Sequence, residues 1–253
     1  MPDSSFYYDA HIYRTQDAEV LLKWLFQQVQ PQSILDVGCG IGTWLQVAKQ
    51  HFGVSDILGI DGSPYDPKTF FLSPNEYRQA DLTQPQKLDR KYDWAFCLEV
   101  GEHLPEGAAQ ILIDTLTAHS DKILFSAAIP GQGGHQHINE QWPGYWQQLF
   151  EQKGYQAFDA VRPIFWHDNS IACWYRQNMF IAAQPDTLPA YWRPVKGELL
   201  SLVHPEIYQY KLHTITELAA AKYDAVFYPK LPFALKTLMK ALFITPFRKR
   251  NYP

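Results

Sequence analysis

A glycine-rich loop between a strand and a helix constrains this chain more than any other feature. Residues 33–37 form an apolar run typical of a buried strand, and residues 43–52 have the apolar spacing of a helix. Gly38, Gly40 and Gly42 lie between them, and glycine lets a backbone turn tightly and approach a ligand closely. The N-terminus of a helix after such a turn favours negative groups. The pattern therefore predicts a cofactor site at the end of a strand.

Strands and helices alternate along the first 185 residues. Further strands are expected at residues 57–61, 77–80, 92–100, 122–128, 155–161 and 174–183, and further helices at residues 16–30, 107–119 and 141–153. This alternation predicts one Rossmann-like α/β domain over residues 1–185, with a seven-stranded, mostly parallel sheet that helices cover on both faces. The last two strands are expected to form an antiparallel pair at one edge. Ligands bind at the carboxyl ends of the strands in this architecture.

The net charge of −4 is unevenly distributed along the chain. Residues 1–185 carry a net charge of −9, and residues 186–253 carry +5. Proteins that grip nucleic acids neutralise phosphates with basic side chains, so the acidic first part argues against DNA as a partner and disfavours RNA. Prolines interrupt the second part, which we expect to be a basic helical extension with helices near residues 208–222 and 232–244.

The second of these expected helices is both amphipathic and basic. Leu231, Leu235, Leu238 and Leu242 fall on one helical face, and a basic run at residues 248–250 follows. A helix of this kind can lie on an anionic membrane surface. The alternative is that the leucine face docks on the domain or on a second subunit, while Lys236 and Lys240, elsewhere on the helix, stay solvated.

Cysteine use and hydropathy indicate the compartment. Cys39, Cys97 and Cys173 are odd in number and form no C-x-x-C pair, which argues against a disulfide framework and against a zinc knuckle. The sequence has no run of about 18 apolar residues, and its first residues lack the basic and apolar regions of a signal peptide. We therefore expect a cytoplasmic protein.

The spacing of the glycines distinguishes between two classes of cofactor. The dinucleotide fingerprint is G-x-G-x-x-G, whereas here the third glycine arrives one residue earlier and an acidic residue precedes the first. Residues 35–42 resemble motif I of the class I methyltransferases that use S-adenosylmethionine, in which the turn wraps the amino-acid end of the cofactor. The resemblance implies that the cofactor is contacted by Asp36, Gly38, Cys39, Gly40 and Thr43.

Later positions follow the same family in order and spacing, over roughly residues 10–185. The family has an acidic residue after the second strand that accepts hydrogen bonds from the ribose hydroxyls, and Asp61 stands there. It has another after the third strand, bonded to the adenine amino group, and Asp81 stands there. Residues 92–104 are close to the family's motif IV. Beyond the glycine loop, the residues expected at the cofactor are Asp61, Gly62, Asp81, Leu82, Glu99 and, in an N-terminal lid, Tyr13.

Two segments carry the side chains of a candidate metal site. Glu99, Glu102 and His103 lie at the end of the fourth strand, and a glycine-rich loop after the fifth strand bears His135 and His137. The two segments are expected to be neighbours at the same edge of the sheet. Carboxylates and imidazoles can hold Mg²⁺ or Mn²⁺ while leaving positions open for substrate oxygens, and such an ion would orient a hydroxyl and lower its pKa.

The E-x-x-E-H spacing resembles the metal-assisted 2′-O-methyltransferases that modify small-RNA ends and the O-methyltransferase of ubiquinone biosynthesis. The resemblance implies a ligand set of Glu99, Glu102, His103 and His137, with His135 as the alternative to His137. Two other interpretations stay open. His103 or His137 acts as a general base without metal, or the residues serve the structure alone. The candidate catalytic residues are His103, His137 and Glu102.

The resulting hypothesis is an S-adenosylmethionine-dependent O-methyltransferase. Its acceptor would be a small molecule with adjacent oxygens, such as a sugar or glycoconjugate hydroxyl. Rings concentrated between Trp142 and Trp192 would stack on that acceptor or pack the edge of the sheet. The alternatives are an RNA-end 2′-O-methyltransferase, and a domain that binds the cofactor or a partner without turnover.

Overall fold

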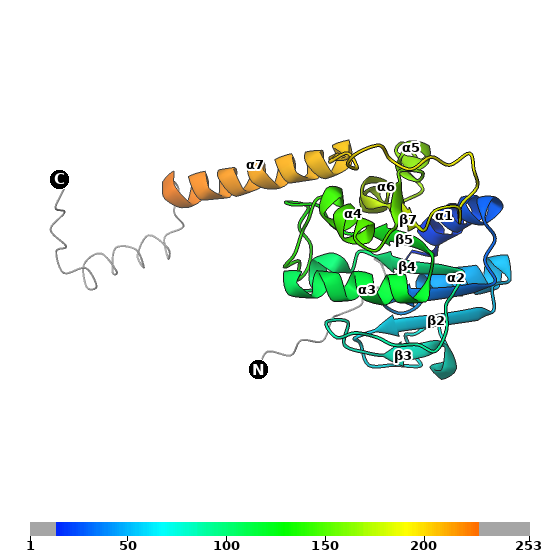
Figure 1. The fold of residues 1–253 in the computed structure, drawn as a ribbon. Coiled ribbons are helices and arrows are strands. Elements are labelled where there is room, and N and C mark those ends of the chain that lie inside the picture. The colour runs from blue at the N-terminus through cyan, green and yellow to red at the C-terminus, as the bar shows by residue number, and fades with distance from the viewer. Residues whose placement is uncertain (1–13, 228–253) are drawn as a thin grey trace. The chain divides into compact units, whose positions relative to one another are not determined.

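The computed structural model describes residues 14–227, and a seven-stranded sheet organises the first of two compact units (Figure 1). The strands are β1 (Ser33–Val37), β2 (Asp56–Asp61), β3 (Tyr77–Gln79), β4 (Trp94–Leu98), β5 (Lys122–Ser126), β6 (Gln156–Phe158) and β7 (Phe180–Ala183). Their order across the sheet is β3-β2-β1-β4-β5-β7-β6. The first unit ends at His204 and the second begins at Pro205.

One strand, β7, runs against its neighbours. It pairs in antiparallel fashion with β5, where Lys122 lies opposite Ala183, and with β6, where Phe158 lies opposite Ile181. The other pairings are parallel. The expected mostly parallel sheet with an antiparallel pair at one edge is confirmed. Since β1 lies between β2 and β4, the loops that follow these three strands meet at one edge of the sheet, where ligands bind in such folds.

Helices cover both faces of the sheet (Figure 1). The helices of the first unit are α1 (Thr15–Gln28), α2 (Thr43–Phe52), α3 (Ala109–His119), α4 (Pro143–Glu151), α5 (Arg162–Phe165) and α6 (Cys173–Asn178), with short 3₁₀ turns η1 (Pro74–Glu76), η2 (Gly101–His103) and η3 (Glu106–Ala108). Along β4, Trp94 and Phe96 pack under α1 and α2, and Ala95 and Cys97 face α3. This alternation is the period of a strand buried on both faces.

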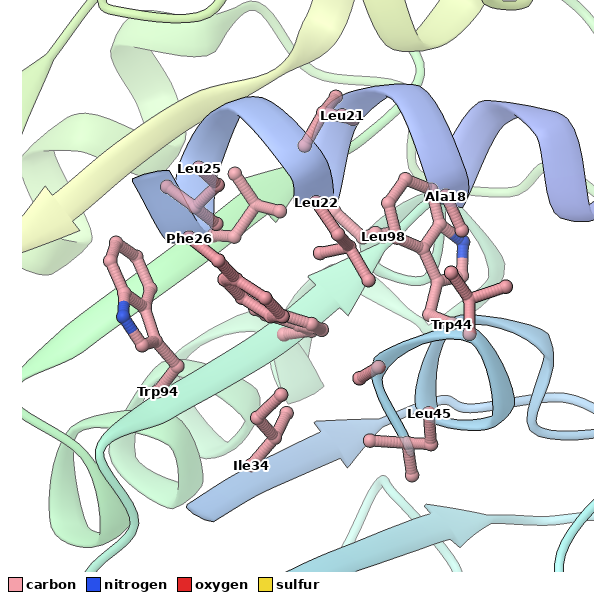
Figure 2. Close-up of a cluster of buried hydrophobic side chains, with 14 of the residues drawn as sticks. Ala18, Leu21, Leu22, Leu25, Phe26, Ile34, Trp44, Leu45, Trp94 and Leu98 are labelled. Carbon is pink, nitrogen blue, oxygen red and sulfur yellow. The ribbon is translucent and has the colours of Figure 1, made fainter. Parts of the chain in front are cut away.

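The apolar layer under α1 and α2 shows why these segments are helical. Leu21, Leu22 and Leu25 recur at helical spacing on α1 and are completely buried. Figure 2 shows this layer, in which side chains of α1 face those of β1, β4 and α2. Burying each such side chain contributes about 1.5–3 kcal/mol, so the stripe fixes the helix on the sheet.

The prediction of a strand at residues 174–183 is wrong for the first half of that range. Residues 173–178 form α6, and only Phe180–Ala183 form a strand. The polar residues Arg176, Gln177 and Asn178 at the end of α6 are buried, and their side chains bond to distant groups. These tertiary hydrogen bonds fix a helix where the alternation of ring and polar residues along the sequence favours a strand.

Residues 186–204 belong to the first unit, although the composition changes after residue 185. The Leu199 side chain is buried in the apolar layer of α3 and α4, and its N–H donates to Gln147 Oε1 at 2.6 Å. The Arg162 guanidinium also donates to the Leu200 carbonyl oxygen at 2.8 Å. These contacts bind the segment to the domain.

The second unit begins with α7 (Pro205–Phe227). Pro205 stands at the start of this helix, as an interrupting proline can, because the missing N–H of proline costs nothing in a first turn. The amphipathic segment at 231–242, the basic run at 248–250 and Tyr13 lie outside the described residues. Within residues 14–227, none of the helices has both the length and the apolar character that a membrane span requires.

Candidate active site

The glycine loop after β1 has the geometry that its sequence predicts. Gly38 and Gly42 have φ angles of 82° and 88°, a left-handed conformation that favours glycine. A Cβ atom would lie 2.3 Å from Val100 Cγ2 at the first position and 2.3 Å from Leu72 Cγ at the second. The N–H of Gly38 donates to the Ile60 carbonyl oxygen of β2 at 2.7 Å. The loop is therefore held in a tight turn against the end of β2.

Asp61, the last residue of β2, is tied to this loop. Its carboxylate accepts hydrogen bonds from the Gly40 N–H and the Ser63 N–H, both at 2.9 Å. Two backbone donors fix the direction of the carboxylate before any ligand arrives. Gly62 follows it at the same edge, as the sequence predicts.

Buried polar atoms beside the loop fit a charged ligand. Asp36 Oδ2 and Thr43 Oγ1 are buried and have no hydrogen-bond partner among the described residues. Burial and the nearby Asp61 charge raise the pKa of Asp36 to about 8. A buried acceptor without a partner is costly unless a ligand donates to it, and the amino-acid end of S-adenosylmethionine carries an ammonium group that can do so. The residues around the glycine loop therefore fit this cofactor.

The residues expected at the adenine lie after β3. The Asp81 carboxylate is exposed and accepts hydrogen bonds from the Thr83 N–H at 2.9 Å and from the Thr83 hydroxyl at 2.7 Å. The next residue, Leu82, packs in the apolar layer that contains Ile60. Cys39 is buried in the opposite layer, so its backbone is the part that can face a ligand.

Glu102, His103 and His137 form a compact cluster at the same edge of the sheet. Their potential ligand atoms all lie within 4.8 Å of one another, and the two imidazole rings are 4.8 Å apart and nearly perpendicular. The 3₁₀ turn η2 after β4 carries the first two residues. The Glu102 side chain is fully buried, and neither of its oxygens has a hydrogen-bond partner of good geometry among the described residues.

The loop after β5 brings His137 to this cluster. The N–H groups of Ile138 and Asn139 donate to the Glu102 carbonyl oxygen at 2.8 and 3.0 Å, which ties the loop to η2. Glu140 lies 2.9 Å from His137 Nδ1 and also accepts a bond from the Gly131 N–H at 2.7 Å. This contact directs Nε2 of the imidazole away from Glu140. The neighbouring His135 is exposed and lies outside the three-residue cluster.

The protonation of the cluster follows from its burial. Burial and the charge of Glu99 raise the pKa of Glu102 well above its usual range. Burial, followed by the charge of His137, lowers the pKa of His103 to about 4. At neutral pH the His103 imidazole is therefore neutral, and without a bound cation the Glu102 carboxyl group keeps its proton to a higher pH than an ordinary glutamate does. A neutral imidazole can accept a proton or bind a metal ion.

Glu99 lies beside this cluster and is not one of its three members. The side-chain amides of Asn178 and Gln132 donate to its carboxylate. The sequence reasoning missed these two amides, as well as Glu140. Only the spacing of three residues between His137 and Glu140 offered a local signal, because Asn178 lies 79 positions from Glu99.

Comparison with known proteins identifies the family. A family described as a methyltransferase domain matches residues 10–167, more than half of the chain. No curated protein sequence matches significantly. Among solved structures, the methyltransferase domain of bacterial CtHen1-C is similar, with a TM-score of 0.50 and 19% identity over 67% of this chain and 97% of that chain.

Two further solved structures have the same similarity in fold. The sugar N-methyltransferase KedS8 of a Streptoalloteichus species has a TM-score of 0.50 and 16% identity, covering 73% of this chain and 98% of its own. DesVI of Streptomyces venezuelae has a TM-score of 0.50 and 13% identity, covering 69% and 93%. At such identities the likeness concerns the fold.

The fold and the glycine loop thus define a Rossmann-like cofactor-binding enzyme. The chain belongs to the methyltransferase-domain family and is a class I S-adenosylmethionine-dependent methyltransferase. The sequence predicted a Rossmann-like fold and S-adenosylmethionine as the cofactor, and both predictions are confirmed for the class of protein.

Replacing Gly134 with alanine is expected to lower turnover about tenfold or more without a large change in Tm. The added Cβ would lie 2.3 Å from His137 Nε2, so the imidazole must move, and misplacing a reacting group by about 1 Å can cost 10²-fold. Gly107→Ala is the control, because nothing lies within 4 Å of a Cβ at that position. Steady-state kinetics and thermal unfolding measure both effects. Equal turnover in the two variants would contradict a role for His137.

Proposed function

We propose that this methyltransferase transfers the methyl group of S-adenosylmethionine to a hydroxyl of a small molecule with adjacent oxygens, such as a sugar or glycoconjugate, with the help of Mg²⁺ or Mn²⁺. The observation that carries the proposal is the Glu102, His103 and His137 cluster. It lies at the carboxyl edge of the sheet, beside the strand that precedes the glycine loop.

The donor set fits a divalent cation. A fully buried carboxyl group whose oxygens have no hydrogen-bond partner of good geometry among the described residues gains most from a nearby positive charge. Contact with Glu140 orients His137, an arrangement typical of metal-binding histidines. Glu102, His103 and His137 would hold the ion, which would lower the pKa of a bound hydroxyl. Three protein ligands leave positions for two acceptor oxygens.

The side chains of the cluster position the acceptor and take its proton. Methyl transfer is a direct displacement at carbon, so its barrier falls when the nucleophilic oxygen is aligned with the methyl group and the sulfur. In the alternative without a metal ion, His103 would take this proton as a general base, because its pKa is lowered to about 4 and the imidazole is neutral at neutral pH. Trp142 and Ile138, both exposed on the loop after β5, offer apolar surface to the acceptor.

A product assay tests the proposed function. Full-length protein is incubated with S-adenosylmethionine and pools of sugars, glycosides and diol-bearing small molecules, and release of S-adenosylhomocysteine is measured. We expect release with acceptors that have adjacent hydroxyls, a loss of more than about tenfold with EDTA, and recovery with Mg²⁺ or Mn²⁺. Activity that is indifferent to EDTA would contradict the metal, and His103 would then act alone.

Two other outcomes would replace the acceptor class. Methylation of RNA ends, with RNA binding that weakens steeply as salt rises, would favour the RNA-end alternative. The net charge of −9 on residues 1–185 argues against that result. Tight binding of S-adenosylmethionine with no product from any pool would favour a cofactor-binding protein without turnover.

A further inference from the structure

A group of side-chain amides, of which those of Gln177 and Asn178 are buried, lies around the carboxylate of Glu99 beside the active-site cluster. Asn178 Nδ2 lies 3.1 and 3.2 Å from the two carboxylate oxygens of Glu99. Gln132 Nε2 lies 3.3 Å from Glu99 Oε2. The amide of Gln177 donates to Gln132 Oε1 at 3.0 Å and to Asn178 Oδ1 at 2.9 Å. Amide donors from two distant segments thus converge on one carboxylate.

The backbone of Glu99 is held in an unusual conformation. Its φ angle is 54°, in the left-handed region that non-glycine residues seldom adopt because it is strained for them. The Glu99 N–H is anchored to Ser126, whose carbonyl oxygen and hydroxyl oxygen lie 3.0 and 3.1 Å away. A glycine would adopt this conformation without strain. The glutamate side chain therefore has a role that the turn by itself does not require.

The amides are costly in the interior unless they serve the site. Asn178 is 2% exposed and Gln177 is 0% exposed, and both stand at the end of α6 directly before β7. Apolar side chains would pack this position without the desolvation cost of buried amides. Gln177 Oε1 also accepts the His204 N–H at 2.6 Å, so the last residue of the first unit is bonded to the same group.

We propose that Asn178, together with Gln132, is a positioning residue that holds the Glu99 carboxylate toward the cluster of Glu102, His103 and His137. The inference rests on the proposed function, because it concerns the cation of that site. The amides donate to both Glu99 oxygens. Glu99 then contributes its charge from beside the cluster, and open positions remain for the acceptor. Partners that orient groups around a metal site typically change metal affinity 10–100-fold when removed.

The test compares Asn178→Leu with Gln147→Leu in the full-length protein. Leucine removes the donors to Glu99 at the first position. At the second it removes an equally buried amide that bonds to Leu199, Gly197 and Glu151 instead. Electron paramagnetic resonance measures Mn²⁺ affinity without cofactor or acceptor, and thermal unfolding measures stability. We expect Asn178→Leu to weaken Mn²⁺ binding about tenfold or more, and Gln147→Leu to lower Tm while keeping the Mn²⁺ affinity of the wild type.

A second variant covers the case in which Asn178→Leu does not fold. Gln132→Leu removes a donor from a partly exposed loop residue and is expected to weaken Mn²⁺ binding in the same direction. Wild-type Mn²⁺ affinity in the folded variants would refute the positioning role and leave the proposed function standing. A wild-type protein that binds no Mn²⁺ would refute the metal site, and the positioning role with it.

Discussion

Replacing Glu102 with glutamine is expected to lower the rate of methyl transfer about a hundredfold or more while leaving the affinity for S-adenosylhomocysteine within about twofold. In the proposed site Glu102 would hold the ion that lowers the pKa of the acceptor hydroxyl, and assistance to removal of a proton typically contributes about 10²–10⁴-fold. Glutamine keeps the shape of the side chain but removes its charge. The cofactor loop is built from other residues, so the substitution separates catalysis from cofactor binding.

The same substitution is expected to stabilise the protein above about pH 5 when no metal is present. Folding raises the pKa of Glu102 well above its ordinary value of 4.5, so the folded state holds this proton more tightly than the unfolded state does. The free energy of unfolding of the wild type therefore falls as pH rises above that ordinary value. Glutamine does not titrate, so the free energy of unfolding of the variant does not fall with pH for this reason.

The control for both measurements is Glu106→Gln. Glu106 is exposed and lies four residues further along the chain, so its loss should change neither turnover nor the pH dependence of Tm. Steady-state kinetics at saturating Mg²⁺, calorimetry with S-adenosylhomocysteine, and thermal unfolding across pH give the comparison. Wild-type turnover in Glu102→Gln would show that Glu102 has no catalytic role.

The parts of the fold that the sequence predicts well are those with local causes. The strand at residues 33–37 and the helix at residues 43–52 have the observed bounds. An apolar run, a glycine turn and a helical stripe each act over a few residues. The prediction was less accurate for β6, because a strand was expected at residues 155–161 and β6 covers only residues 156–158. Its pairing with β7 decides where it ends.

The cluster could be anticipated from topology. Glu102 and His103 follow β4 and His137 follows β5, and these strands are parallel neighbours. Their carboxyl ends must therefore meet. His103 and His137 are 34 positions apart in the sequence, and their rings are 4.8 Å apart in the structure. The order of the strands is enough to predict that they are neighbours. Which of the two loop histidines enters the cluster depends on Glu140, whose contact with His137 forms only in the folded loop.

The polar residues behind the cluster could not be anticipated. Along the sequence, Arg176, Gln177 and Asn178 belong to the stretch at residues 174–183, which the pattern predicts to be a strand at one edge of the sheet. In the structure they are buried, because their partners come from segments far away in the chain. A local sequence pattern around Asn178 cannot reveal its hydrogen bond to Glu99, because the two residues are 79 positions apart.

Replacing Asp61 with asparagine is expected to weaken binding of S-adenosylhomocysteine about a hundredfold. A carboxylate accepts hydrogen bonds at both oxygens, and Asp61 already accepts from the N–H groups of Gly40 and Ser63. Asparagine must turn an NH₂ group toward one of these donors, which disturbs the loop. It also removes the charge that would strengthen the hydrogen bonds expected from the ribose hydroxyls of the cofactor, and bonds to a charged group contribute about 1.5–3 kcal/mol each.

The matched control for this substitution is Asp56→Asn. Asp56 begins the strand that Asp61 ends, and it forms an exposed ion pair with Arg90 at the opposite edge of the sheet. Pairs of that kind contribute about 0–1 kcal/mol, so its loss should leave ligand affinity unchanged. Calorimetric titration of both variants measures the difference. Equal affinities would mean that the cofactor does not lie across the end of β2, because no other acidic side chain among residues 14–227 bonds to the glycine loop there.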